Sequence, residues 1–103
     1  MRRGTTPTLT FTTPYEATEV ASGYITFTQR STIVLDLNIP SSEVTVSDNE
    51  IAVQLTQAQT LQFDQSTNAP AQAQIRLILT DGNVVGSNIV EIPICAILKD
   101  GEI

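Results

Sequence analysis

Residues 71–79, AQAQIRLIL, alternate small or apolar side chains with polar ones along their whole length. Successive side chains of a β-strand point to opposite faces of the sheet, so this alternation is typical of a half-buried strand. The expected inward face consists of Ala71, Ala73, Ile75, Leu77 and Leu79. Asp81 and Gly82 follow, and this pair favours a type I′ hairpin turn because glycine accepts a positive φ. The stretch therefore predicts a strand that turns back on itself.

The same period of two recurs along the chain, and helical periodicity is nearly absent. Between Thr32 and Ile39 it places Ile33, Leu35 and Leu37 inward and Val34 outward. Turn residues separate such segments at intervals of about ten residues, which predicts an all-β, antiparallel, immunoglobulin-like β-sandwich of about seven or eight short strands. A closed barrel is the alternative. The expected strands cover residues 8–12, 23–28, 32–39, 44–46, 51–55, 71–79, 84–85 and 89–98.

One stretch, LTQAQTLQFD at residues 55–64, departs from the alternation. Thr56 is a residue type that caps helices, so a single helical or 3₁₀ turn is expected after it. Leu61 and Phe63 would then plug the open end of the sandwich where the chain crosses between sheets. Residues 64–70, DQSTNAP, have the composition of a surface loop.

The composition limits the classes of partner. The chain has 103 residues and a net charge of -6, which disfavours binding to nucleic acid because phosphates require clustered cations. Its longest nearly apolar run, Ile92 to Leu98, contains Pro93 and is far shorter than the ~20 residues of a transmembrane helix. Thr-rich sequence replaces the apolar core of a secretory signal. We expect no nucleic-acid partner, no membrane span and a cytoplasmic site of folding.

The residue types of catalysis are sparse. Histidine is absent, which removes the commonest general base and metal ligand. Cys95 lies in an apolar strand pattern and is expected to be a small core residue. Asp48 and Glu50 lack the spacing of a calcium loop and read as a turn, as do residues 81–83. We therefore expect no catalytic residues, no metal, no cofactor and no enzymatic activity.

Residues 1–6 form an extended N-terminal arm in this interpretation, and residues 7–103 form one sandwich domain. Proline at position 7 favours extended backbone before it. The arm is either a frayed terminus or a segment that crosses to a neighbouring subunit, where its two cations would meet an acidic surface. The candidate interface consists of Arg2, Arg3, Thr5, Thr6 and Pro7.

Four segments carry a resemblance that spans nearly the whole chain: MRRGTTPT (1–8), LTQAQTLQFD (55–64), IRLILTDGNVVGSNIVEI (75–92) and LKDGEI (98–103). Together they resemble a family of small prophage proteins of Gram-positive bacteria, encoded among phage structural genes near tail or baseplate components. The chain departs from that family between Gln57 and Gln62, where Gln and Ala replace acidic or Lys residues.

The resemblance implies a phage or prophage structural or assembly protein of the tail, baseplate or connector region. Such a protein would act by docking to other phage structural proteins and by forming homo-oligomers. It would be found in the bacterial cytoplasm during assembly and would then either stay in the virion or leave as an assembly helper. The alternative, from another class, is a ligand-binding module that recognises a host-surface glycan or receptor.

Overall fold

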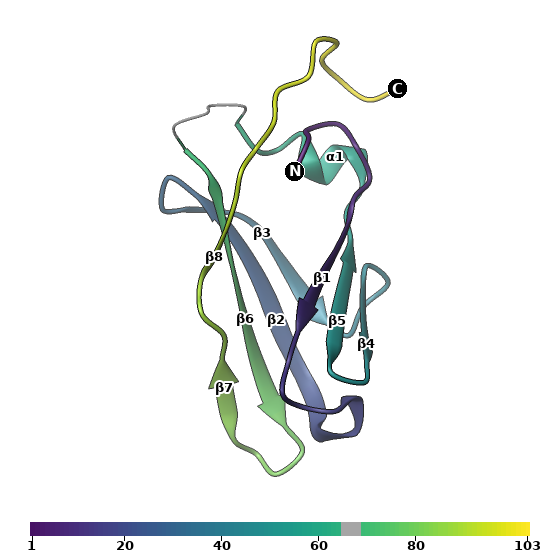
Figure 1. Cartoon of the computed structure of the whole chain (residues 1–103), viewed down its shortest axis with the longest axis vertical. Helices are drawn as coiled ribbons and strands as arrows, with labels where there is room; N and C mark the ends of the chain where they lie inside the picture. The colour runs from purple at the N-terminus through teal and green to yellow at the C-terminus, as the bar shows by residue number, and fades with distance from the viewer. Residues whose placement is uncertain (65–68) are drawn as a thin grey trace.

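The computed structural model describes residues 1–64 and 69–103, and these form two antiparallel β-sheets that make a sandwich (Figure 1). The prediction of an all-β antiparallel sandwich is confirmed, and its immunoglobulin-like assignment stays a prediction. The smaller sheet has the strand order β1 (Thr8–Thr12), β5 (Glu50–Gln54), β4 (Val44–Ser47). The larger has the order β3 (Thr32–Ile39), β2 (Val20–Gln29), β6 (Ala71–Leu79), with β7 (Val84–Gly86) and β8 (Val90–Ile92) both paired to β6. The expected surface loop lies, for residues 65–68, outside the described part.

The last strand is shorter than expected. β8 ends at Ile92, and the next residue, Pro93, has no N–H with which to continue a ladder. β7 and β8 share one edge of β6 by pairing with its two ends, Arg76–Ile78 and Ala71–Ala73 respectively. The chain between β1 and β2 forms a 3₁₀ turn, η1 (Ala17–Glu19).

The core lies between the two sheets and is built from their inward faces. Phe27 on β2 and Phe63 meet edge to face, with ring centroids 6.1 Å apart. Phe63 follows the short helix α1 (Gln57–Thr60), which the Thr56 side chain caps by accepting a bond from the Gln59 N–H. Both the predicted cap and the burial of Phe63 are confirmed. The largest fully buried side chains are Phe27, Phe63, Ile25, Ile39, Ile51, Leu55, Val44, Val53 and Thr60.

A β-bulge in β3 corrects the predicted faces of that strand. The register with β2 shifts between Phe27, which pairs with Leu35, and Thr28, which pairs with Ile33. Val34 is therefore the extra residue; it is half-buried and packs against the core. Ile33 turns outward with 64% of its surface exposed, although strict alternation placed it inside.

Two hairpin turns of the larger sheet show features that the sequence did not predict. Gly82 alone has a positive φ in the β6–β7 loop, so the turn is not type I′. Instead, the Gly82 N–H donates to the Leu79 carbonyl oxygen, and the left-handed glycine ends a three-residue loop. Two successive positive φ values occur at Arg30 and Ser31, between β2 and β3, although neither residue is a glycine or asparagine, the types that usually adopt them.

Candidate interaction surfaces

The N-terminal residues lie against the last segment of their own chain, beside α1 (Figure 1). Arg2 forms a parallel bridge with Cys95. The Cys95 N–H donates to the Met1 carbonyl oxygen at 2.7 Å, and the Arg3 N–H donates to the Cys95 carbonyl oxygen at 3.2 Å. The Met1 side chain packs against the core, whereas the sequence predicted an extended arm there. Crossing of this segment to a neighbouring subunit stays a prediction.

Arg3 holds three parts of the chain together. Its Nε donates to the carbonyl oxygen of Phe63 at 2.6 Å, and its Nη2 donates to that of Leu61 at 3.1 Å. Its Nη1 lies 3.4 Å from the Asp100 carboxylate, and only 13% of the side chain is exposed. The planar guanidinium fork suits several fixed acceptors at once, which lysine could not satisfy. Arg3 thus ties the N-terminal segment to the end of α1 and to the chain after β8.

The other candidate interface residues lie at the same end of the molecule. The Thr5 carbonyl oxygen accepts from the buried Thr60 hydroxyl at 3.0 Å. The Pro7 carbonyl oxygen accepts from the Leu55 N–H, also at 3.0 Å. Thr5 and Thr6 are exposed. The structure therefore brings all five residues together. Sequence reasoning missed the acceptors that hold Arg3, because the positions of main-chain carbonyl oxygens cannot be read from a sequence.

Replacing Arg3 by alanine should lower the free energy of unfolding by about 2 kcal/mol, because charge-assisted bonds to partly buried carbonyls are lost. Arg2→Ala is the matched control: Arg2 is exposed and its side chain donates one bond, to the Ala96 carbonyl oxygen. The control should change stability by about 0.5 kcal/mol or less. Urea unfolding of both variants measures the difference, and equal losses would contradict the tethering role of Arg3.

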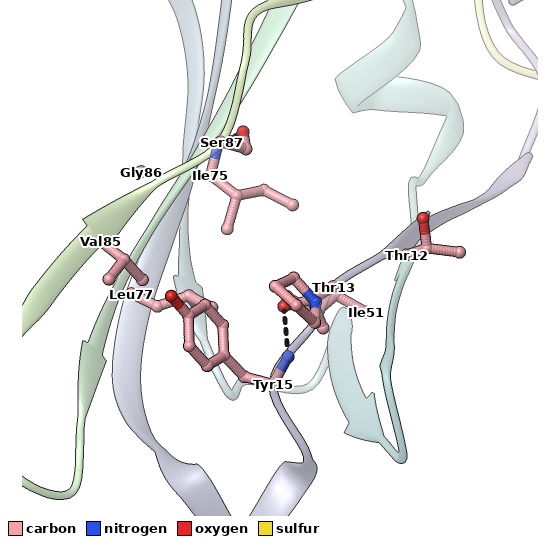
Figure 2. Close-up of a pocket in the computed structure, with 10 residues that line it drawn as sticks. Thr12, Thr13, Tyr15, Ile51, Ile75, Leu77, Val85, Gly86 and Ser87 are labelled. Carbon is pink, nitrogen blue, oxygen red and sulfur yellow. Dashed lines mark hydrogen bonds between the residues drawn. The ribbon is translucent and has the colours of Figure 1, made fainter.

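The two sheets leave a seam on the side where β1 and β7 are edge strands. A cavity of about 150 Å³ opens there (Figure 2). Figure 2 shows Tyr15, from the chain just after β1, lying close to Leu77 and Val85 of the larger sheet. The apolar wall of the seam is made by Pro14, Tyr15, Ile51, Ile75, Leu77 and Val85.

The edge of β1 beside this seam is open. Thr13 N–H donates to the Asn49 carbonyl oxygen at 3.0 Å, so the main-chain groups of odd-numbered residues face β5. Because these groups alternate in direction along an antiparallel strand, those of the even-numbered residues face away from the sheet. β1 has the sequence TLTFT, without the charge or proline that normally protects an edge. The outward main-chain groups belong to Thr8, Thr10 and Thr12.

The residues that were considered for catalysis or metal binding lie in turns or pair through their main chains. The sequence predicted Cys95 to be a core residue inside a strand. In the structure Cys95 is half-buried and its main chain pairs with that of Arg2, while its neighbour Ile94 is buried. Asp48 lies in the β4–β5 turn, as predicted, and the Asp81 carboxylate accepts from the Asn83 N–H at 2.9 Å within its own turn. Over residues 1–64 and 69–103, no three His, Cys, Asp or Glu side chains gather as metal ligands would.

Comparison with known proteins returns no match: no family model fits the chain, and neither a curated protein nor a solved structure resembles it significantly. In the described part, helices are too short and too polar to cross a bilayer.

Proposed function

We propose that this protein is a structural or assembly component of a phage or prophage particle, in its tail, baseplate or connector region. It is an immunoglobulin-like sandwich that acts by docking and self-association. It meets its partners, copies of itself and other phage structural proteins, in the bacterial cytoplasm during assembly and stays with the virion. The observation that carries the proposal is the open, uncharged edge of β1.

The occupant of this edge is β1 of a second copy. An antiparallel pair about a two-fold axis is self-complementary, and the outward groups of β1 are spaced for it. With the axis at Thr10, Thr10 pairs with Thr10 of the second copy, and Thr8 pairs with Thr12 of that copy. Leu9 then lies opposite Phe11, and both are half-buried before association. Main-chain bonds supply the affinity in such strand addition.

The neutral composition of β1 favours this pairing. A chain of net charge -6 repels its own copies, and the repulsion is weaker where the contacting strand itself carries no carboxylate. The five residues of β1 are uncharged, so pairing with β1 of the second copy places no like charges opposite one another. The three-stranded sheets of two copies would join into one continuous sheet. The apolar side chains along the seam would then be less exposed to water.

Thr10→Pro tests the proposal. Proline removes the outward N–H at the centre of the pair but leaves the bonds from β1 to β5 intact, since edge strands tolerate proline on their solvent side. We expect the dissociation constant of the homo-oligomer to rise about tenfold or more, equivalent to about 1.4 kcal/mol. Thr10→Ala is the control, because it keeps the N–H and should leave association unchanged. Sedimentation velocity over a dilution series measures both variants.

Two results would overturn the proposal. Equal weakening by Thr10→Pro and Thr10→Ala would show that the main chain of β1 does not pair. A wild-type protein that stays monomeric but is retained by host cells or by an immobilised glycan would establish the ligand-binding alternative instead.

A further inference from the structure

We infer that the outer face of the larger sheet is a second self-association surface, which binds the same face of another copy. This outer face consists of the outward side chains of β3, β2, β6 and β7 together with Ile89. It shares no residue with the edge of β1, so the inference stands or falls independently of the proposed function.

Exposed apolar side chains concentrate on this face. Eight large hydrophobic residues are exposed in the described part of the chain, and five of them belong to the outer face. Their positions follow from the strand register, because residues paired across antiparallel strands share a face: Tyr24 pairs with Arg76, Ile33 with Thr28, and Ile78 with Val84. The five are Tyr24 (51% exposed), Ile33 (64%), Ile78 (39%), Val84 (56%) and Ile89 (58%).

Neutral polar side chains fill the middle of this face. Thr26, Thr28, Gln72 and Gln74 lie side by side on β2 and β6, and with Ile89 they line a shallow hollow of about 80 Å³. Burying threonine and glutamine costs far less than burying lysine or glutamate, because no full charge leaves water. A face with apolar anchors and few charges has the composition of an interface core.

The charges that the face does carry suit a second copy of the same face. Asp36 on β3 pairs with Thr26, and Arg76 on β6 pairs with Tyr24, so β2 separates the acid from the base. A two-fold axis near Tyr24 places Arg76 of each copy opposite Asp36 of the other. Each contact then occurs twice, which is the property of an isologous interface.

The bonds that Asp36 and Arg76 form within one chain do not prevent this reciprocal contact. The Asp36 carboxylate accepts one bond, from the Thr26 hydroxyl at 2.9 Å. Arg76 is exposed and, within the described ranges, forms no ion pair. A third charge, Glu91 of β8, borders the face; it pairs with Gln72 at the other end of β6, away from Arg76.

Reversing the charges tests this surface. Arg76→Asp leaves an acid at both ends of the reciprocal contact and Asp36→Arg leaves a base at both ends, so each single variant should dissociate about tenfold or more readily than the wild type. The double variant carries both reversals, regains the attraction and should associate as the wild type does. Introducing the reversals into Thr10→Pro isolates this face from the β1 edge, and sedimentation velocity measures the dissociation constants.

A mixing experiment covers the case in which Thr10→Pro perturbs the fold. Arg76→Asp and Asp36→Arg, each in the otherwise wild-type chain, should form a mixed complex that native mass spectrometry detects by mass. A double variant that associates no better than the single variants, together with no preference for the mixed complex, would overturn the inference. Loss of association by Thr10→Pro with normal behaviour of the charge variants would leave only the β1 interface.

Discussion

Replacing Gln29 with leucine is expected to lower the free energy of unfolding by about 3 to 5 kcal/mol. The Gln29 side chain is buried, with 6% of its surface exposed. Its Nε2 donates to the carbonyl oxygens of Asp64 and Ala69 at 2.9 and 2.7 Å, and its Oε1 accepts from the Asp64 N–H at 2.7 Å. Leucine matches the volume but leaves three main-chain groups without partners. The change should appear as a lower urea midpoint.

Gln54→Leu is the matched control, since Gln54 is exposed on β5, outside both proposed interfaces, and no core group depends on its side chain. Its effect on the free energy of unfolding should be about 0.5 kcal/mol or less. If the two variants unfold at the same urea concentration, Gln29 does not hold the chain on the two sides of residues 65–68 as the structure implies.

Gly23→Ala is the second large effect, with an expected loss of about 3 kcal/mol. A Cβ atom at position 23 would lie 2.3 Å from the carbonyl oxygen of Arg76 and 2.9 Å from Cδ2 of Leu77. The nearest atom belongs to the main chain of a neighbouring strand, so β2 and β6 would have to move apart. Thermal or urea unfolding would register the loss.

Gly86→Ala provides the comparison within the same sheet. Its Cβ would meet nothing closer than the Ile75 carbonyl oxygen at 3.9 Å, and its φ is not positive. Because alanine also restricts the unfolded chain, this variant should be neutral or up to about 1 kcal/mol more stable. A destabilisation as large as that of Gly23→Ala would show that the close approach of β2 and β6 is not the cause.

The sequence predicted the parts of the fold that depend on local pattern. Alternation over residues 71–79 located β6 and its buried face, because the period of side chains in a strand is fixed by geometry. Thr56 located α1, because its hydroxyl accepts a bond from a residue only three positions later. Phe63 was placed in the core because two apolar residues follow a polar helical turn.

The features that sequence did not predict depend on distant partners. The bulge at Val34 breaks the alternation and moves Ile33 to the outer face, and no neighbouring residue signals it. The sequence shows Arg3 only as a cation near the N-terminus, because its acceptors, the carbonyl oxygens of Leu61 and Phe63, belong to a distant segment. The need for glycine at position 23 arises from β6, more than 50 residues later. The composition of the outer face could therefore not be predicted from alternation alone, because the bulge adds Ile33 to it.

The two proposed interfaces have a combined consequence. One two-fold interface produces a closed dimer, but two different ones on the same chain allow association to continue beyond it. The edge of β1 and the outer face of the larger sheet belong to different sheets, so neither contact uses the residues of the other.

We propose that this sandwich functions by associating with copies of itself. Sedimentation velocity of the wild-type protein over a wide dilution series tests that claim most directly. We expect the weight-average sedimentation coefficient to rise with concentration through the dimer and beyond it. A single species with the mass of one 11.1 kDa chain at every concentration would contradict the account.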